Sequence, residues 1–206
     1  GGGRTPPGPP PQRRGGRAPD AMEVVVEGAD AGPRSDAAGT IAFARALPLE
    51  HALHPDTLLA THMNDEPLSP HHGAPVRLVV PGWYGMASVK WVRRIELSTK
   101  TFDGYFQRRR YVYDDADGVR PVARMRVKSI ITTPGENESV PVGMVRVEGW
   151  AWSGEGAIAR VEVSAHGGGS WHPALLTPPA SPHAWTRWSC DLDLGVPGRY
   201  LLRSRA

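Results

Sequence analysis

The sequence predicts an α+β chain of two units, a mixed α/β unit at residues 21–118 and an antiparallel β-sandwich at residues 119–206. The 206 residues suffice for one or two small domains, and 40% of them are hydrophobic, enough to form a buried core. The 24 glycines and 21 prolines exceed a fifth of the chain, which predicts many turns and few long helices. Short apolar runs between turn motifs in the second half favour β-structure there.

Residues 1–20, GGGRTPPGPPPQRRGGRAPD, form a tail of different composition. The segment has no large apolar side chain, so burial cannot offset the entropy lost on ordering, and we expect it to be disordered. A basic arm for nucleic acid is the alternative interpretation, and a solvated tail is favoured over it.

The first unit alternates short apolar runs with loops. A β-branched run at 22–28 predicts a strand, and IAFARALPLEHAL at 41–53 predicts a strand or a short helix. VRLVVPG at 76–82 is typical of a buried strand, whereas SVKWVRRIELS at 88–98 alternates apolar and polar residues like a half-buried strand. GYFQRRRYVYDD at 104–115 predicts an aromatic strand that ends in an acidic turn.

The second unit consists of short strands at regular spacing, punctuated by PGEN, SGEG, HGGGS and VPG. We count five or six strands, whereas an immunoglobulin-like sandwich has about seven, so the sandwich is expected to be truncated at its C-terminal end. Its tryptophans are interpreted as core or dimer-interface residues rather than as ligand-stacking ones. These are Trp150, Trp152, Trp171, Trp185 and Trp188.

The charge pattern favours a small anionic ligand over nucleic acid. The net charge is only +3, and the pI of about 9.3 reflects a surplus of Arg over Lys. The run Arg108–Arg110 would alternate faces on a strand, so it predicts no continuous basic surface. There is no apolar run of membrane-spanning length and no signal peptide pattern, so a soluble chain without a membrane partner is expected, and the compartment stays open.

Cysteine and histidine usage argues against a protein-bound metal. Cys190 is the single cysteine of the sequence, which excludes an internal disulfide and a cysteine-based zinc site. Five histidines are close together but lie in proline-broken loops without a zinc-ligand spacing, so no metal site is predicted from them. They are His51, His54, His62, His71 and His72.

Two long stretches resemble the sulfite oxidase family of molybdopterin oxidoreductases. The first is LLATHMNDEPLSPHHGAPVRLVVPGWYGMASVKWVRRIEL, within a similarity that runs from residue 27 to 113. The second, RVKSIITTPGENESVPVGMVRVEGWAWSGEGAIARVEVSAHGGGSWHPALL, resembles the family's dimerisation domain. The resemblance implies the C-terminal part of a molybdopterin-binding domain at 21–118, an immunoglobulin-like dimerisation domain at 119–206, and a homodimer.

The same resemblance assigns the site residues. The family motif HGxPxR is matched at His72 to Arg77, the SVK stretch at 88–90, and the EGxD turn at Asp30. The implied pterin-binding residues are Asp30, His72, Arg77, Ser88, Val89 and Lys90. Physical chemistry agrees, because a pterin with a phosphate tail requires an Arg fork, a Lys point charge and backbone N–H groups from glycine-rich turns. Tyr111 matches the family tyrosine of the substrate pocket, where a phenol donates to an oxyanion.

Three functions from different classes follow. The resemblance implies an enzyme that uses the molybdenum cofactor to move an oxygen atom between water and a small substrate such as sulfite. In the family the metal-holding cysteine lies in a preceding half-domain, and Cys190 lies in the sandwich segment, so this chain alone is expected to be inactive. A non-catalytic molybdopterin-binding or assembly module and a purely structural dimerisation unit are the alternatives.

The first unit is expected to expose apolar strand edges, because partner strands are missing.

Overall fold

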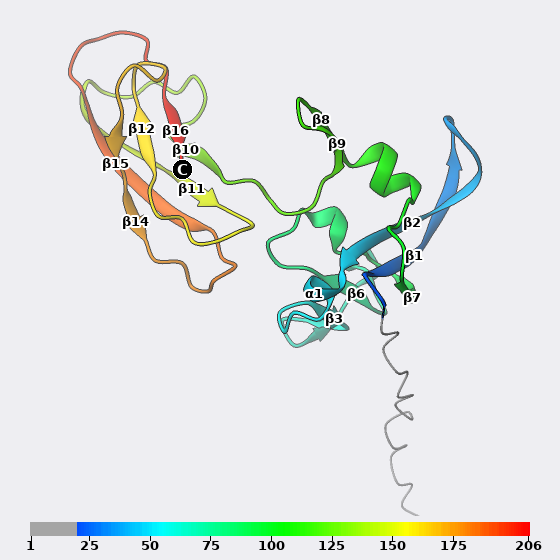
Figure 1. Cartoon of the computed structure of the whole chain (residues 1–206). Helices are drawn as coiled ribbons and strands as arrows, with labels where there is room; N and C mark the ends of the chain where they lie inside the picture. Colours follow the sequence, from blue (N-terminus) through cyan, green and yellow to red (C-terminus); the bar gives the residue numbers. More distant parts are fainter. Residues whose placement is uncertain (1–19) are drawn as a thin grey trace, which may run out of the picture.

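The computed structural model describes residues 20–206, so the predicted tail lies outside the described residues except for its last position. Figure 1 shows two β-rich parts joined by an extended segment around residues 122–127. The helices are short. They are α1 (Leu49–Ala52), the 3-10 turns η1 (Pro70–His72) and η2 (Gly85–Ala87), and the π-helix η3 (Phe106–Arg110).

The first part is built on an antiparallel sheet with the order β2-β1-β7. Its strands are β1 (Glu23–Arg34), β2 (Ala37–Pro48) and β7 (Val92–Ser98). Burial alternates along the start of β1, as expected of a strand with one face on the core. The buried residues of this core are Val24, Val26, Leu47, Leu49, Leu78, Val80, Ala87 and Val89.

Three two-stranded ladders hold the loops around this sheet. They are β3 (Leu58–Ala60) with β6 (Arg77–Val79), β4 (His62–Met63) with β5 (Glu66–Pro67), and β8 (Val112–Asp115) with β9 (Gly118–Pro121). The loop after η1 and the loop after η2 meet beside β1, because the Trp91 N–H donates to Gly73 O at 3.3 Å and the Ala29 N–H donates to Trp91 O at 2.9 Å.

The second part has two antiparallel sheets packed on a shared core. The four-stranded sheet has the order β10-β11-β15-β14 and the three-stranded sheet β13-β12-β16. Trp188 is fully buried between them, together with Val147 and Val163. The strands are β10 (Lys128–Thr133), β11 (Gly143–Trp152), β12 (Glu162–Ser164), β13 (His172–Pro173), β14 (Leu175–Thr177), β15 (Thr186–Leu194) and β16 (Arg203–Arg205).

Several expectations need correction. The two sheets contain seven strands rather than five or six, because the stretch after β11 that we read as one strand forms three short ones, β12, β13 and β14. The described residues form mostly strands with few helical turns, so the expected mixed α/β character of the first part is only a minor feature. Strand β7 is largely exposed rather than half-buried, because it is the edge of its sheet, and Ile95 is 48% exposed.

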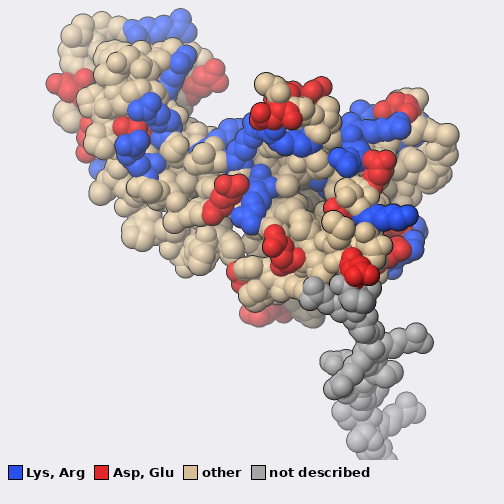
Figure 2. All heavy atoms as spheres, in the orientation of Figure 1, with Lys and Arg blue, Asp and Glu red and all other residues tan. Residues whose placement is uncertain are grey.

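The segment GYFQRRRYVYDD is also different from the prediction of a single strand. Its centre is the π-helix η3, and only its end forms β8. Arg108, Arg109 and Arg110 are therefore on a helical turn and all exposed, instead of alternating between the faces of a strand. Figure 2 shows basic and acidic side chains interspersed on the visible face, without a continuous basic surface.

The two parts of the molecule meet where the backbone segments around Gly82, Met125 and Gly154 contact one another. Met125 N–H donates to Gly82 O at 2.9 Å, and Gly154 N–H donates to Met125 O at 2.8 Å. A Cβ on Gly82 would lie 2.9 Å from Gly154 O, so the first part and the sandwich approach each other through glycines. His183 Nε2 lies 2.9 Å from Asp56 Oδ2 across the same junction, and this hydrogen bond lowers the pKa of the Asp56 carboxyl.

None of the helices at residues 20–206 is both long enough and apolar enough to cross a lipid bilayer.

Candidate cofactor-binding site

The loops after η1 and η2 bring two cations onto one turn. Lys90 Nζ donates to His71 O at 3.1 Å, and Arg77 Nη1 donates to His72 O at 3.2 Å. Gly73 lies between them with φ of 102°, and a Cβ there would be 2.8 Å from the Lys90 Cβ and 3.1 Å from the Arg77 Cβ. The structure therefore places Lys90 beside His72 and Arg77, although Lys90 comes from the loop after η2 and the other two from the segment between η1 and β6.

Strand β1 approaches the same turn through an irregularity. The register with β2 shifts between Glu27 and Ala31, which marks a β-bulge next to Asp30. Ala29 N–H donates to Trp91 O at 2.9 Å, and a Cβ on Gly28 would lie 2.7 Å from Lys90 O. The bulge thus seats the exposed Asp30 beside the backbone of Lys90.

The electrostatics of the turn suit an anion. Arg77 Nε is buried and has no hydrogen-bond partner, and within residues 20–206 neither Arg77 nor Lys90 has a carboxylate within salt-bridge distance. Lys90 Nζ also lies 4.4 Å from the centre of the Trp91 ring. His72 contributes an imidazole whose Nδ1 is 2.8 Å from Ser69 Oγ. Two unneutralised cations with a free donor are chemically a site for a phosphate or another oxyanion.

Ser88 and Val89 support the site from behind rather than facing it with their side chains. Ser88 Oγ accepts the Val80 N–H at 3.1 Å, and the Val89 side chain is 1% exposed. Val89 O accepts the Leu78 N–H at 2.8 Å, which ties the segment before Lys90 to β6. Their part in any ligand contact would therefore be through the position they give to Lys90.

Tyr111 lies elsewhere in the first part. It follows the π-helix η3, is 38% exposed, and its ring centre is 6.3 Å from those of Phe43 and Phe106. Among the described residues no hydrogen bond or ring contact joins Tyr111 to the turn that carries His72 and Arg77.

Arg45 is a candidate that the sequence did not single out. This arginine is 1% exposed, with its Cζ 5.8 Å from the Tyr111 ring centre. Burial lowers the pKa of its guanidinium, and Tyr111 raises it by a smaller amount. The only sequence signal was one Arg within the apolar run IAFARAL, a pattern that also fits a snorkelling side chain.

The remaining candidates are the loop histidines and Cys190. Across residues 20–206 the structure has no group of three or more potential metal ligands, and most of the loop histidines are exposed. His51 is half-buried against Trp83, at 5.4 Å between ring centres. Cys190 is buried in β15 opposite Val147, far from the cationic turn along the fold, and burial raises the pKa of its thiol.

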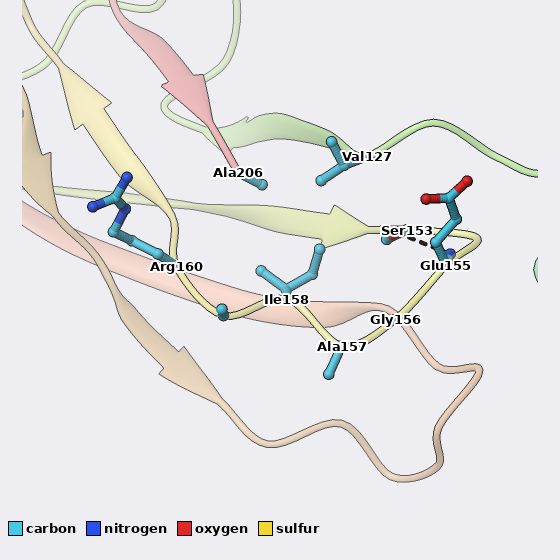
Figure 3. A pocket seen from close by; sticks show the side chains of 9 residues that line it. Val127, Ser153, Glu155, Gly156, Ala157, Ile158, Arg160 and Ala206 are labelled. Atoms are coloured by element: carbon cyan, nitrogen blue, oxygen red, sulfur yellow. Dashed lines mark hydrogen bonds between the residues drawn. The ribbon is translucent and has the colours of Figure 1, made fainter.

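Hollows in the second part do not coincide with this site. One of about 630 Å³ lies at the open end of the sandwich, with Val127, Ile158 and Ala206 on its wall (Figure 3). Another of about 280 Å³ lies at the junction and includes Trp152 and Trp185, whose rings stack at 4.3 Å. Neither hollow is lined by Arg77 or Lys90.

Models of two protein families match the chain. The oxidoreductase molybdopterin binding domain matches residues 11–106, and the Mo-co oxidoreductase dimerisation domain matches residues 119–197. The chain belongs to the sulfite oxidase family of molybdopterin oxidoreductases. The resemblance recognised in the sequence is therefore confirmed, and the family is one of molybdenum-dependent oxidoreductases.

Individual relatives agree with this assignment. Mitochondrial sulfite oxidase of Drosophila melanogaster is 37% identical over 203 residues, covering 88% of this chain and 35% of that protein. The Homo sapiens enzyme is 38% identical, covering 80% of this chain and 32% of its own length. Nitrate reductase [NADH] of Hordeum vulgare is 35% identical over 84% of this chain and 22% of its own length. The chain thus spans about a third of the sulfite oxidases that it matches.

A solved structure gives the same result for the fold. The sulfane dehydrogenase SoxCD from Paracoccus pantotrophus superposes with a TM-score of 0.75 at 38% sequence identity, covering 90% of this chain and 46% of that chain.

The residues of the cationic turn fit the family's cofactor. A molybdopterin has an anionic phosphate, and the buried, unpartnered Arg77 Nε with the Lys90 ammonium supplies the positive charge such a group requires. Gly73 and Gly28 lack the Cβ atoms that would fill the space between β1, Arg77 and Lys90.

Proposed function

We propose that this chain contributes the pterin-holding part of a molybdenum-dependent oxidoreductase of the sulfite oxidase type. The observation that carries the proposal is the pairing of Arg77 and Lys90 on consecutive carbonyls of one turn, with Arg77 Nε buried and unpartnered. In this proposal Arg77 and Lys90 bind the cofactor's anionic end. His72 and Asp30 bind the polar edges of the pterin ring. The segment of residues 88–90, with Ser88 and Val89, fixes the distance between the loop after η1 and the loop after η2.

The molybdenum cofactor, when bound, supplies the two-electron oxygen-atom transfer. The chain's own share is orientation and electrostatics. Arg77 and Lys90 hold the cofactor by charge-assisted hydrogen bonds, each worth roughly 1.5–3 kcal/mol. Tyr111 donates its phenolic hydrogen to an oxygen of a small anionic substrate such as sulfite, which orients that substrate.

We further propose that this chain alone holds the pterin without turnover. Cys190, the single cysteine of the sequence, is buried in the sandwich core, so a thiolate for the metal would have to come from a residue outside this sequence. The alternative, a non-catalytic molybdopterin-binding or dimerisation module, is favoured by this same observation.

The domain assignment completes the proposal. We propose a molybdopterin-binding part at 21–118 and an immunoglobulin-like dimerisation domain at 119–206 through which the chain forms a homodimer. The four-stranded and three-stranded sheets around Trp188 support the second assignment, since two sheets over one core are what such a sandwich requires. Sedimentation that shows a dimer at high protein concentration supports the homodimer, and a monomer at every concentration rejects it.

Co-purification from a host that makes the cofactor tests the pterin site. We expect the chain to retain pterin, measured as its fluorescent oxidised derivative, with little molybdenum by elemental analysis. Arg77→Ala should lower pterin retention at least about tenfold, because one charged hydrogen bond is lost. Arg187→Ala is the control, since Arg187 pairs with Glu148 within the sandwich. Equal retention in both variants would reject the site.

A further inference from the structure

The buried Arg45 joins three segments that are far apart in the sequence. Its Nη1 donates to Phe106 O at 2.9 Å, and its Nη2 donates to Val122 O at 2.7 Å. Arg45 is on β2, Phe106 starts the π-helix η3, and Val122 follows β9. A forked guanidinium is suited to this geometry because its two terminal nitrogens reach two acceptors at once.

Both of these acceptor residues are also the backbone partners of Tyr111. The Tyr111 N–H donates to Phe106 O at 3.1 Å, so this carbonyl accepts from Tyr111 and Arg45 together. The Val122 N–H donates to Tyr111 O at 2.8 Å, and the Val122 carbonyl accepts from Arg45. Arg45 therefore joins the two residues that hydrogen-bond to the Tyr111 backbone, Phe106 and Val122. Its guanidinium also lies near the Tyr111 ring.

The charge of Arg45 is more than the packing requires. Burying a cation is costly, and in the described part of the chain no carboxylate lies within salt-bridge distance of Arg45. A methionine would fill similar volume without that cost. What an apolar side chain cannot do is hold the carbonyls of Phe106 and Val122 in fixed positions. Phe106 begins a π-helix, a rare element that is frequent at functional sites.

We propose that Arg45 is a positioning residue that sets the place and orientation of the Tyr111 phenol. This inference rests on the proposed substrate role of Tyr111. Arg45 acts through the carbonyls of Phe106 and Val122 and through its contact with the ring, and it does not touch substrate itself.

A second clamp on the same π-helix provides a matched control. On the outer side, Arg110 Nε donates to the Tyr105 hydroxyl at 2.8 Å, and that hydroxyl donates to Asp36 Oδ1 at 2.5 Å. Arg110 also approaches Asp36 at 3.5 Å, and its side chain is 50% exposed. Removing Arg110 therefore removes an arginine from η3 but leaves the hydrogen bonds from Arg45 to the Phe106 and Val122 carbonyls in place.

Fluorine NMR of the full chain labelled with 3-fluorotyrosine tests the inference. Tyr111→Phe identifies the Tyr111 resonance among those of the five tyrosines. We expect Arg45→Met and Arg45→Lys to move or broaden this resonance by more than its linewidth, because neither side chain can hold both carbonyls. Tyr200, in the sandwich, should keep its resonance, and Arg110→Met should change the Tyr105 resonance and leave that of Tyr111 in place.

The conservative variant keeps the test decisive. If Arg45→Met does not fold, Arg45→Lys retains the charge and carries the comparison. An unchanged Tyr111 resonance in a folded Arg45→Lys chain overturns the proposal, as does an equal change at Tyr111 in Arg110→Met. The readout needs no cofactor, so loss of pterin binding in Arg77→Ala and movement of Tyr111 in Arg45→Lys are observed separately.

Discussion

Lys90 crosses Gly73 so closely that a Cβ on residue 73 would lie 2.8 Å from the Lys90 Cβ. Gly73 also has φ of 102°, a backbone conformation that residues other than glycine rarely adopt. We therefore expect Gly73→Ala to cost about 1 kcal/mol or more in the free energy of unfolding and to displace Lys90 from the turn. Urea unfolding and pterin retention measure the two effects.

Gly39→Ala separates the backbone strain from the steric contact. Gly39 has φ of 77°, but a Cβ there would meet nothing within 4 Å. Both substitutions should show the strain, and only the one at Gly73 should also reduce pterin retention. Equal retention in the two variants would contradict a role for the Gly73 and Lys90 contact in the site.

The sequence could indicate the members of this turn but not the way they meet. The spacing of His72 and Arg77 was visible as a motif, and Lys90 as part of another. Their convergence depends on β6 lying antiparallel to β3 and on the loop after it returning to β1, which are long-range pairings. Local propensity does not encode such pairings, whereas the regular spacing of short strand-like runs between turn motifs predicted β11 and β15 directly.

The half-buried His51 should make stability depend on pH. Arg124 Nη2 lies 2.5 Å from His51 Nε2, a contact in which the imidazole must accept and therefore be neutral. Burial first, and then the charge of Arg124, lowers the pKa of His51 below 6.5. The unfolded chain therefore binds more protons below about pH 6.5, so stability should fall as the pH drops from 7 towards 5.

Urea unfolding at several pH values measures this dependence. His51→Gln removes the titrating group, so the decline between pH 7 and 5 should be smaller than in the unmodified chain. His172→Gln is the control, because His172 is an exposed residue of β13. A decline of the same size in His51→Gln and the unmodified chain would show that other groups cause it.

Asp56 and His183 should stabilise the junction between the two parts. Their contact of 2.9 Å is exposed, and exposed ion pairs contribute little to stability, so the pair should shift an opening equilibrium only slightly. Asp56→Asn should therefore accelerate tryptic cleavage after Arg124 and Arg126, at most about fivefold, because these exposed residues lie in the connecting segment. Glu162→Gln, which breaks ion pairs within the sandwich only, should leave the cleavage rate unchanged.

The π-helix and the burial of Arg45 illustrate where sequence reasoning stopped. GYFQRRRY contains aromatic and basic residues that suit a strand as well as a helical turn, and its conformation is decided by contacts with β2. Gln107 Oε1 accepts the Ala46 N–H at 2.9 Å, and Arg45 holds the Phe106 carbonyl. Arg45 and Ala46 are each 61 residues away from their partners in η3. A local stretch of sequence therefore cannot show that this segment forms a helical turn.

Cys190 should behave as a core residue and not as a metal ligand. Its thiol is 7% exposed on β15, and burial raises the thiol pKa, so little reactive thiolate is present at pH 8. A disulfide reagent should modify the native chain at least about a hundredfold more slowly than the urea-unfolded chain, because reaction requires opening of the sandwich. Cys190→Ala should leave pterin retention unchanged, since the cationic turn is in the other part of the molecule. Rapid modification of the native chain, or pterin loss in Cys190→Ala, would refute the structural role and make Cys190 a candidate for the missing thiolate.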